Sequence, residues 1–258
     1  MMLTVKDVYD WVNAFAPFET AEDYDNVGLI LGRFDAPVTC ILAALDCTMD
    51  VVKEAERLGA QLILTHHPLL FHARKDLREE DPEAKVLCAL IRNHMSLLSA
   101  HTNLDRAQNS TSDVLARLFS LKNPRGDEFM RCGELEKPMT AGQLRESAAR
   151  ILNAPVRLYG DPEQEITTLA VGAGAYDEGY PEARKLGAQA YLTGEVHHHN
   201  AIAAVQEGLV LLEAGHYATE APGLRALGDC LQTGLDRLQY SVTLHHFSGP
   251  PYPGALDM

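Results

Sequence analysis

Residues 38–65 read VTCILAALDCTMDVVKEAERLGAQLILT and contain the pattern that decides the fold. An apolar run from Ile41 to Leu45 predicts a buried strand, and Met49 to Leu58 predicts a helix that stops at Gly59. A second apolar run, Leu62 to Leu64, predicts another buried strand. A strand, a helix and a strand in this order are typical of a parallel sheet flanked by helices, so the sequence predicts an α/β fold.

The same pattern returns at an offset of 128 residues. Residues 166–193 read ITTLAVGAGAYDEGYPEARKLGAQAYLT and align with residues 38–65 without a gap. The block LGAQ at Leu58–Gln61 recurs unbroken at Leu186–Gln189. Strand–helix–strand units resemble one another for physical reasons, so chance is one explanation, but the unbroken block favours an internal duplication. We therefore expect two related α/β halves, each with a mostly parallel sheet.

The remaining elements and the domain borders follow from periodicity and turn signals. A polar, turn-rich segment at residues 122–128 is the expected joint between the halves. The first domain is expected to comprise residues 1–124 with about 214–258, and the second residues 125–213. Helices are expected at 4–15, 83–94, 113–119, 140–152, 201–207 and 221–238, strands at 27–31, 97–99, 209–212 and 240–246, and little structure from residue 250 on.

Composition limits the partners of this protein. The 258 residues include 36 acidic and 22 basic side chains, and the net charge of −14 argues against nucleic-acid or anionic-membrane binding through bulk charge. No apolar run approaches the about 18 residues that a membrane span needs, and the N-terminus lacks a signal-peptide pattern. The five cysteines are scattered and never form a CxxC pair, so we expect reduced thiols and a cytoplasmic protein.

The first candidate site residues are the adjacent histidines of Thr65-His66-His67-Pro68. Pro68 has no N–H group, so the strand ladder should end here. Side chains just beyond a strand end point into the crevice where open α/β sheets bind ligands. One interpretation is that both imidazoles bind a metal. The other is that one is a structural hydrogen-bonding group and the other is exposed.

Three further strand ends carry side chains that bind metals. His101 and Asp105 follow the strand at 97–99, and Glu195 follows the last strand of the second repeat. His216 and Glu220 lie four residues apart, so they should share one face at the start of a helix. Glu220 has an alternative role, because an acidic side chain near a helix N-terminus interacts favourably with the helix dipole.

The nature of these side chains indicates the kind of metal. Imidazole and carboxylate groups together favour Zn, Fe(II), Mn or Co over Ca or Mg. Five such ligands exceed the needs of one tetrahedral site, whereas two ions that share a bridging carboxylate would use them and keep open positions. We therefore predict a site for two divalent metal ions between the two halves.

Two motifs are more ambiguous. Asp25-Asn26 before Val27-Gly28 can be site residues, but ordinary turn chemistry is the favoured interpretation. The triplet His197–His199 is expected to support the ligands or to be exposed, and direct ligation is the less favoured alternative.

Together these motifs resemble the family of GTP cyclohydrolase 1 type 2 homologues, also called the Ngg-one-interacting-factor-like family. The resemblance rests on the segments 25–29, 65–69, 101–105, 192–199 and 215–220, in that order. It implies a toroidal homohexamer whose sites face the inside, and a short form without the insert that many members carry between the halves. It also implies that two metal ions are held by His66, His67, Asp105, His216 and Glu220, with Glu220 as the bridge.

The resemblance implies a hydrolase that opens the imidazole ring of GTP and releases formate, or acts on a related nucleotide or a small phosphorylated or heterocyclic substrate. Glu195 and His101 are the expected catalytic residues, because each can move a proton near neutral pH. The alternative is a metal-binding scaffold or partner-binding protein without turnover. Nitrogen and oxygen ligands with open positions favour the enzyme. The absence of a GxxxxGK[ST] phosphate loop and the acidic charge disfavour GTP.

Overall fold

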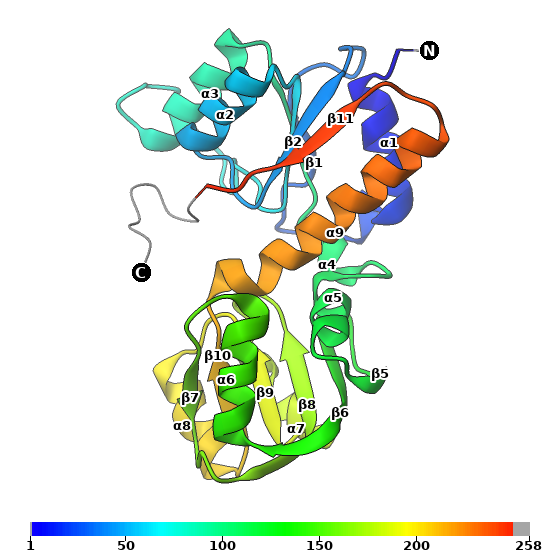
Figure 1. Cartoon of the computed structure of the whole chain (residues 1–258). Coiled ribbons are helices and arrows are strands. Elements are labelled where there is room, and N and C mark those ends of the chain that lie inside the picture. Colours follow the sequence, from blue (N-terminus) through cyan, green and yellow to red (C-terminus); the bar gives the residue numbers. More distant parts are fainter. Residues whose placement is uncertain (1, 250–258) are drawn as a thin grey trace. The chain divides into compact units, whose positions relative to one another are not determined.

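The structure is a computed structural model that describes residues 2–249, and it consists of two compact units. The first unit runs to Ala107 and resumes at Leu224, and the second comprises Gln108–Gly223. In Figure 1 the first unit contains the elements from blue to blue-green and the red strand, and the second contains the elements from green to yellow. The orange helix begins in the second unit and continues into the first. The borders of these units lie at residues 107/108 and 223/224, whereas the predicted domain borders are 124/125 and about 213/214.

The first unit is built on a five-stranded sheet in the order β1-β4-β3-β2-β11. Strands β11, β2, β3 and β4 run parallel, and β1 pairs antiparallel with β4 at the edge. The three central strands are buried at every position, which explains why they appear in the sequence as continuous apolar runs. Their bounds are Gly28–Leu31 for β1, Cys40–Ala44 for β2, Leu62–Thr65 for β3, Ser96–Ser99 for β4 and Thr243–His246 for β11.

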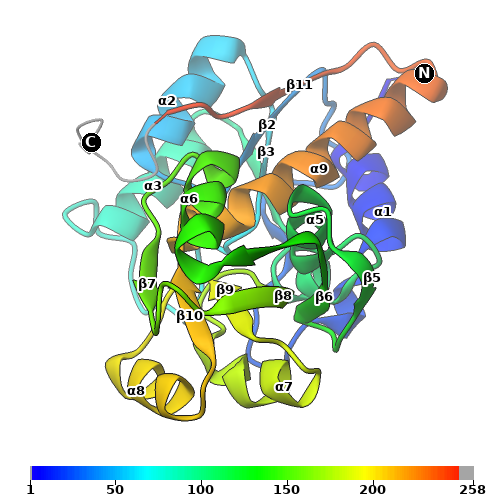
Figure 2. The same cartoon turned by 60° about the horizontal axis from the view of Figure 1, so that its bottom comes forward.

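Helices lie on both sides of this sheet. Helices α2 and α3 pack together, and their apolar side chains form one core cluster with β2, β3 and β4, whereas α1 lies on the other side in both views (Figures 1 and 2). A capping box between Thr4 and Asp7 starts α1, as the sequence predicts for Thr4. The helices are α1 (Val5–Phe15), α2 (Met49–Leu58), α3 (Pro82–Arg92) and the short α4 (Thr102–Arg106), with a 3₁₀ turn η1 at Phe18–Thr20.

The second unit contains a six-stranded mixed sheet in the order β5-β6-β8-β9-β10-β7. Its central strands β8, β9 and β10 run parallel, whereas β5, β6 and β7 are added antiparallel. The predicted joint at 122–128 was wrong, because residues 122–125 form the edge strand β5, where Pro124 is tolerated. The bounds are Lys122–Arg125 for β5, Met130–Thr140 for β6, Arg157–Tyr159 for β7, Glu165–Gly172 for β8, Ala190–Thr193 for β9 and Val210–Glu213 for β10.

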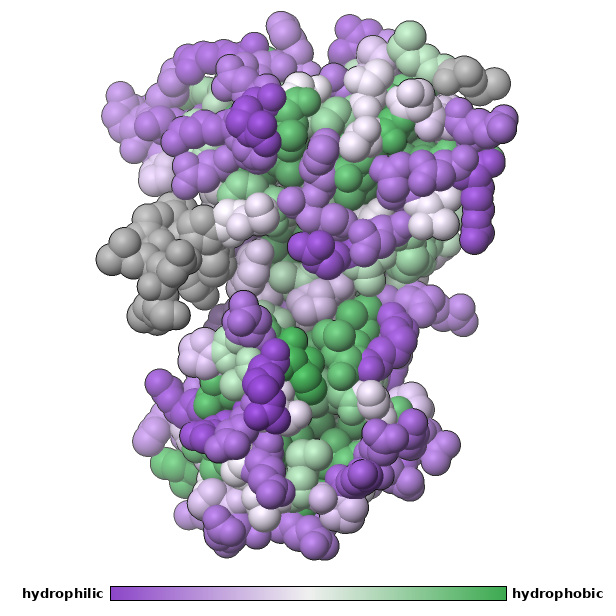
Figure 3. Space-filling model, in the orientation of Figure 1, coloured by the Kyte–Doolittle hydropathy of each residue, from purple (hydrophilic) through white to green (hydrophobic). Residues whose placement is uncertain are grey.

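Alternating side chains of β8, β9 and β10 pack against helices on opposite faces of the second sheet. Leu169, Leu192 and Leu212 belong to the cluster with α5 and α6, whereas Tyr191 and Leu211 belong to the cluster with α7 and α8. In Figure 3 hydrophobic residues also reach the surface of this unit between α5 and α6. The helices are α5 (Thr111–Leu118), α6 (Ala141–Leu152), α7 (Tyr180–Lys185) and α8 (His198–Gln206), with a 3₁₀ turn η2 at Asp177–Gly179. Helix α9 (His216–Arg237) begins in this unit and belongs to the first unit from Leu224 on.

Two helices begin at least three residues earlier than the sequence predicted. Helix α8 starts at His198 rather than at residue 201, and α9 starts at His216 rather than at residue 221, with Pro222 inside it. None of the helices in the described part of the chain is long and apolar enough to cross a membrane. The predicted unstructured tail from residue 250 lies outside the described residues.

The repeated LGAQ block has the same structural role in both units. The side-chain oxygen of Gln61 accepts hydrogen bonds from Thr39 N at 2.8 Å, Thr39 Oγ1 at 3.1 Å and Cys40 N at 3.0 Å. The side-chain oxygen of Gln189 accepts from Thr167 N at 2.7 Å, Thr167 Oγ1 at 2.8 Å and Thr168 N at 3.2 Å. Each glutamine therefore holds the neighbouring strand, Gln61 at the start of β2 and Gln189 at Thr167 and Thr168 of β8, which is the geometry that a duplication would preserve.

The glycine of each block is needed for a backbone reason. Gly59 has φ +68° and Gly187 has φ +84°, the left-handed conformation that follows a helix and favours glycine. The chain can then turn sharply from α2 into β3 and from α7 into β9. In each block the glycine thus ends a helix, and the glutamine two residues later holds the neighbouring strand through hydrogen bonds.

We predict that Gln61→Ala destabilises the protein by about 1–3 kcal/mol, because three hydrogen bonds lose their shared acceptor. Gln189→Ala should have an effect of similar size in its own unit. Urea denaturation followed by circular dichroism measures both, with Gln206→Ala as the control, because Gln206 is exposed at the end of α8. Equal urea midpoints for Gln61→Ala and Gln206→Ala would show that the hydrogen bonds to Gln61 contribute nothing to the free energy of unfolding.

Candidate metal centre

Three histidines meet at the carboxyl ends of β3 and β4 in the first unit. His66 and His67 follow β3, and His101 follows Ala100 after β4. Their ligand nitrogens lie within 4.8 Å of one another. The ring centroids are 5.2 Å apart for His66 and His67, and 5.1 Å for His66 and His101. The structure therefore groups His101 with the histidine pair that the sequence singled out.

Each imidazole of this group is oriented by an oxygen atom at Nδ1. His66 Nδ1 donates to Ala100 O at 2.8 Å, and His67 Nδ1 donates to Asp46 Oδ1 at 2.7 Å. His101 Nδ1 donates to Asp25 Oδ1 at 2.9 Å. These bonds require the proton on Nδ1 and leave each Nε2 lone pair directed away from the partner oxygen. Metal-binding histidines are held in this way by a carboxylate or carbonyl.

Asp105 adds a carboxylate to the same group. It lies in the short helix α4, and its Oδ2 is 3.8 Å from His66 Nε2. His66 is completely buried, and the Asp105 side chain is 15% exposed. The described residues of the first unit therefore bring together His66, His67, His101 and Asp105, all of which the sequence proposed for a site.

Asp25 is the residue whose role the sequence interpretation missed. Its side chain is fully buried and accepts hydrogen bonds from His101 and from the backbone N and Oγ1 of Thr102, at 3.1 and 2.5 Å. Burial alone would raise the pKa of Asp25, but the hydrogen bonds from His101 and Thr102 outweigh it and lower the pKa to about 2. The carboxylate therefore stays charged at neutral pH and fixes the ring of His101.

The neighbouring Asn26 supports the segment after the histidine pair. Its Nδ2 donates to the carbonyl oxygen of Leu70 at 2.7 Å. The favoured interpretation of Asp25-Asn26 as ordinary turn chemistry was therefore incomplete, since Asp25 orients His101 and Asn26 holds the segment that follows His66 and His67. The motif in segment 25–29 was the only sequence signal for this role.

The second unit carries its own group at the start of α9. His216 is the first residue of that helix, and its Nε2 lies 2.9 Å from Glu220 Oε2, as expected for side chains four residues apart on one face. His216 Nδ1 donates to Glu195 Oε1 at 2.8 Å. Glu195 is 55% exposed and Glu220 is 7% exposed. Glu195 is thus in place to orient the His216 ring.

Small residues make room for this second group. A Cβ atom at Gly174 would collide with Glu220 Oε1, and one at Gly194 would lie 2.6 Å from Gly174 O and 2.8 Å from Thr219 Oγ1. Thr219 Oγ1 also accepts a hydrogen bond from Gly174 N at 3.1 Å. The loops after β8 and β9 must therefore be glycine at these positions for α9 to approach them closely.

The histidine triplet lies at the start of α8, where its first residue, His197, is held by Asp177. Asp177 accepts from His197 N at 2.6 Å, from His197 Nδ1 at 3.1 Å and from Asn200 Nδ2 at 2.9 Å, so it caps the start of α8. The hydrogen bond with Asp177 raises the pKa of His197, whose side chain is 60% exposed. This arrangement agrees with the favoured interpretation of the triplet as supporting or exposed residues.

Residues 3–251 match the model of a protein family described as Duf34/NIF3 (NGG1p interacting factor 3). The chain belongs to the Duf34/NIF3 family. This result confirms the resemblance that the five sequence segments indicated.

Relatives within the Duf34/NIF3 family cover nearly the whole chain. A GTP cyclohydrolase 1 type 2 homolog from Clostridium acetobutylicum is 32% identical, over 92% of this chain and 93% of the relative. One of the same name from Streptomyces coelicolor is 34% identical, over 95% and 91%. The crystal structure of Staphylococcus aureus hypothetical protein SA1388 has a TM-score of 0.92 at 25% identity and covers 100% of both chains.

A further Duf34/NIF3 relative of known structure is reduced HcgD from Methanocaldococcus jannaschii, with a TM-score of 0.84 and 29% identity over 96% of this chain and 99% of that one. These structures confirm the α/β fold of two mixed sheets flanked by helices. The names of the relatives describe different proteins, and none of them by itself states what this chain does.

We predict that Asp25→Asn makes the free energy of unfolding depend less on pH in the acidic range. The folded pKa of about 2 is below the ordinary value of 3.8, so the ionised carboxylate stabilises the fold above about pH 4. That stability is lost as the pH falls from about 4 to 2, and it amounts to about 2 kcal/mol. Urea denaturation of chelator-treated protein at several pH values, followed by the fluorescence of Trp11 in the same unit, measures it.

The matched control is Asp23→Asn, because Asp23 is an exposed carboxylate two residues away. The control should keep the steep acid dependence of the natural protein. A profile for Asp25→Asn that is as steep as that of the control would contradict the assignment.

Proposed function

We propose that this protein is a metal-dependent hydrolase with two divalent metal ions per subunit. The observation that carries the proposal is the common orientation of the imidazoles. Nδ1 of His66, His67 and His216 is in each case held by an oxygen. Nε2 of His66 faces the carboxylate of Asp105, and Nε2 of His216 faces that of Glu220. The proposed ligands are His66, His67 and Asp105 of the first unit and His216 and Glu220 of the second, with Glu220 as the bridging carboxylate.

The donor atoms of the two groups fit such ions. They are imidazole nitrogens and carboxylate oxygens, and neither group contains a cysteine among the described residues. This set favours Zn, Fe(II), Mn or Co. Bound ions of this kind would lower the pKa of a water molecule and stabilise negative charge on a substrate.

His101 is the proposed proton carrier of the first unit. Asp25 fixes its Nδ1 proton, so its Nε2 is the atom that exchanges a proton with a substrate or a water molecule. A buried carboxylate behind an imidazole holds the ring in one tautomer and one orientation, as in other acid–base pairs. The buried, charged Asp25 therefore presents Nε2 of His101 as the atom that can act as a base.

Glu195 is the proposed catalytic residue of the second unit. Its Oε1 accepts the Nδ1 proton of His216, which gives it an orienting role. Its side chain is more than half exposed, so Oε2 is the atom proposed to exchange protons. The two roles are compatible, because a carboxylate has two oxygens with separate lone pairs.

The proposed substrate is GTP or a related nucleotide, or a small phosphorylated or heterocyclic molecule. Support comes from the name GTP cyclohydrolase 1 type 2 homolog, which the relatives from C. acetobutylicum and S. coelicolor carry. In the proposed cyclohydrolase reaction, water opens the five-membered ring of the guanine base, and the carbon between the two nitrogens of that ring leaves as formate.

The assembly and the compartment belong to the same proposal. We infer a toroidal homohexamer from the family resemblance, and sedimentation equilibrium that found only monomers would contradict it. We infer a cytoplasmic location because Cys40, Cys47, Cys88, Cys132 and Cys230 are all free thiols.

We predict that Glu220→Ala loses at least one metal ion per chain and stays folded, because the bridging carboxylate is removed. Elemental analysis by mass spectrometry measures the metal content, and circular dichroism verifies folding. The control is Glu163→Ala, since Glu163 is an exposed carboxylate of the same unit. Unchanged metal content in Glu220→Ala would overturn the ligand assignment.

We predict that protein reloaded with Zn, Mn or Fe(II) releases formate from GTP, and that Glu220→Ala does so at least tenfold more slowly. Formate is measured with a coupled dehydrogenase assay, with chelator-treated protein as the blank. Formate that depends on metal and on Glu220 supports the cyclohydrolase. If fully metal-loaded protein releases no formate, GTP is not its substrate. If the same protein also hydrolyses none of a panel of phosphoesters and nucleotides, the result favours the metal-binding scaffold.

A further inference from the structure

Two large aromatic rings lie exposed beside the histidine group of the first unit. Tyr24, in the turn before β1, is 65% exposed, and Phe71, in the loop after β3, is 40% exposed. The centroids of these two rings are 6.1 Å apart, and the centroid of Phe71 is 6.2 Å from that of His101. The two rings, which we call the aromatic pair, therefore border the proposed proton carrier.

Hydrogen bonds hold both ends of the turn before β1. Glu22 N donates to Thr102 Oγ1 at 3.0 Å, and Asn26 Nδ2 donates to Leu70 O at 2.7 Å. Leu70 directly precedes Phe71, so the second bond also ties together the two segments that carry the aromatic pair. A site whose parts are held in advance loses less conformational entropy when a ligand binds.

The surroundings of Phe71 leave part of its ring for a ligand. Tyr24, His72 and His101 stand at interplanar angles of 59°, 76° and 78° to it, so none of these neighbours is stacked parallel on the ring. Offset parallel stacking is a favoured arrangement of aromatic rings. A planar ligand can adopt it on the exposed part of Phe71.

Polar groups lie at one side of the aromatic pair. The ring centroid of His101 is 5.5 Å from that of His67, so the histidine group begins where the aromatic pair ends. A ring stacked on Phe71 would therefore lie next to His101, whose Nε2 is proposed to exchange a proton. Apolar and aromatic side chains with a few polar groups are the usual lining of a small-molecule site.

We propose that the aromatic pair binds a planar heteroaromatic ring of the substrate by stacking, next to His101. The substrate is then a heterocycle such as a nucleobase, rather than a phosphoester without a ring, because stacking needs a flat π-system. The identification of this ligand as the substrate rests on the proposed function, whereas its binding to the aromatic pair does not.

The test is calorimetric titration of the full-length, chelator-treated protein with guanosine monophosphate and with ribose phosphate. The two probes share the sugar and the phosphate and differ in the base. Guanosine monophosphate should bind about tenfold or more tightly than ribose phosphate, because only its base can stack. Equal affinities, or no binding of guanosine monophosphate at millimolar concentrations, would overturn the proposal.

Variants of the aromatic pair locate the bound base. Phe71→Ala and Tyr24→Ala should each weaken the binding of guanosine monophosphate about tenfold, whereas Tyr24→Phe keeps the ring and should bind as the natural protein does. The matched control is Phe34→Ala, since Phe34 is 45% exposed in the same unit and its ring packs edge-on against Tyr9. Circular dichroism verifies folding. A Phe71→Ala variant that binds as tightly as Phe34→Ala would contradict the proposal.

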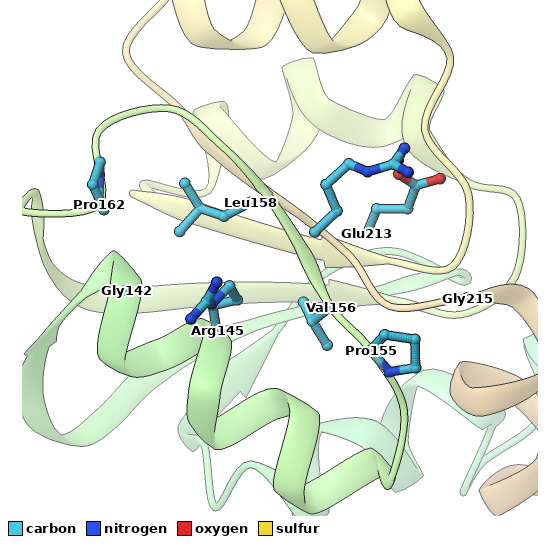
Figure 4. Close-up of a pocket in the computed structure, with 9 residues that line it drawn as sticks. Gly142, Arg145, Pro155, Val156, Leu158, Pro162, Glu213 and Gly215 are labelled. Atoms are coloured by element: carbon cyan, nitrogen blue, oxygen red, sulfur yellow. Dashed lines mark hydrogen bonds and ion pairs between the residues drawn. The ribbon is translucent and has the colours of Figure 1, made fainter. Parts of the chain in front are cut away.

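A hollow in the second unit is the rival location for the same probe. It has a volume of about 780 Å³ and lies beside α6 and β7 (Figure 4). Its lining includes Arg145 of α6 and the apolar side chains of Val156 and Leu158. Arg145→Ala alters this hollow and leaves the aromatic pair intact. Weaker binding of guanosine monophosphate to Arg145→Ala, but not to Phe71→Ala, would place the base in the hollow and overturn the proposal.

The outcome for the aromatic pair is separate from that for the hydrolase, because the titrated protein is free of metal. Binding that depends on Phe71, without formate release from metal-loaded protein, would support the aromatic pair and reject the cyclohydrolase. Conversely, formate release with the same KM for GTP in Phe71→Ala as in the natural protein would leave the hydrolase standing and reject the aromatic pair as its subsite.

Discussion

The histidine group of the first unit depends on the alignment of two buried parallel strands, β3 and β4. Thr65 lies opposite Ser99, and their hydroxyl groups are hydrogen bonded at 2.8 Å in a fully buried environment. The next residues continue this alignment, because Ala100 N donates to Thr65 O at 2.9 Å and His66 Nδ1 donates to Ala100 O. A slip of one residue would turn every side chain of the strand to the other face. The strand register therefore determines where the imidazoles of His66 and His101 meet.

The second unit uses the same backbone plan for a different set of side chains. At the offset of 128 residues, Glu195 takes the position of His67, and Gly174 takes the position of Asp46. In the first unit Asp46 orients His67, whereas in the second Glu195 orients His216, and Gly174 leaves the space that Glu220 fills. Both copies of the repeat thus keep the strand end and the glutamine, Gln61 or Gln189, that holds the neighbouring strand. The side chains just beyond that strand end differ between the copies. Duplication explains why two unequal ligand groups lie at equivalent strand ends.

Local signals explain which parts of this fold were predictable. The predicted bounds of the helix at Met49–Leu58 agree with α2, because Thr48 caps its start and Gly59 stops it. The strands β5, β6 and β7 were missed, since they lie toward the edges of their sheet, and residues 134–138 of β6 (ELEKP) contain one apolar side chain among charged residues and a proline. Helix α4 is only five residues long, too short to show a period.

Long-range contacts explain what was missed at the candidate site. Asp25 and His101 are 76 residues apart in the chain, so no local pattern could show that a turn-like motif orients a histidine. Likewise, α8 begins at His198 because the buried Asp177, which precedes His197 by 20 residues, accepts hydrogen bonds from His197 N and from Asn200 Nδ2. The candidate ligands themselves were predictable, because their residue types at strand ends and the four-residue spacing of His216 and Glu220 are local features.

The distribution of charge bears on the kind of molecule that this protein can accept. The chain as a whole is acidic, and Asp25, Asp46 and Glu195 each lie directly behind an imidazole. Negative charge in these positions strengthens a histidine as a base or a metal ligand but repels polyanions at longer range. Among the proposed substrates, this long-range repulsion favours those that carry fewer negative charges than a triphosphate.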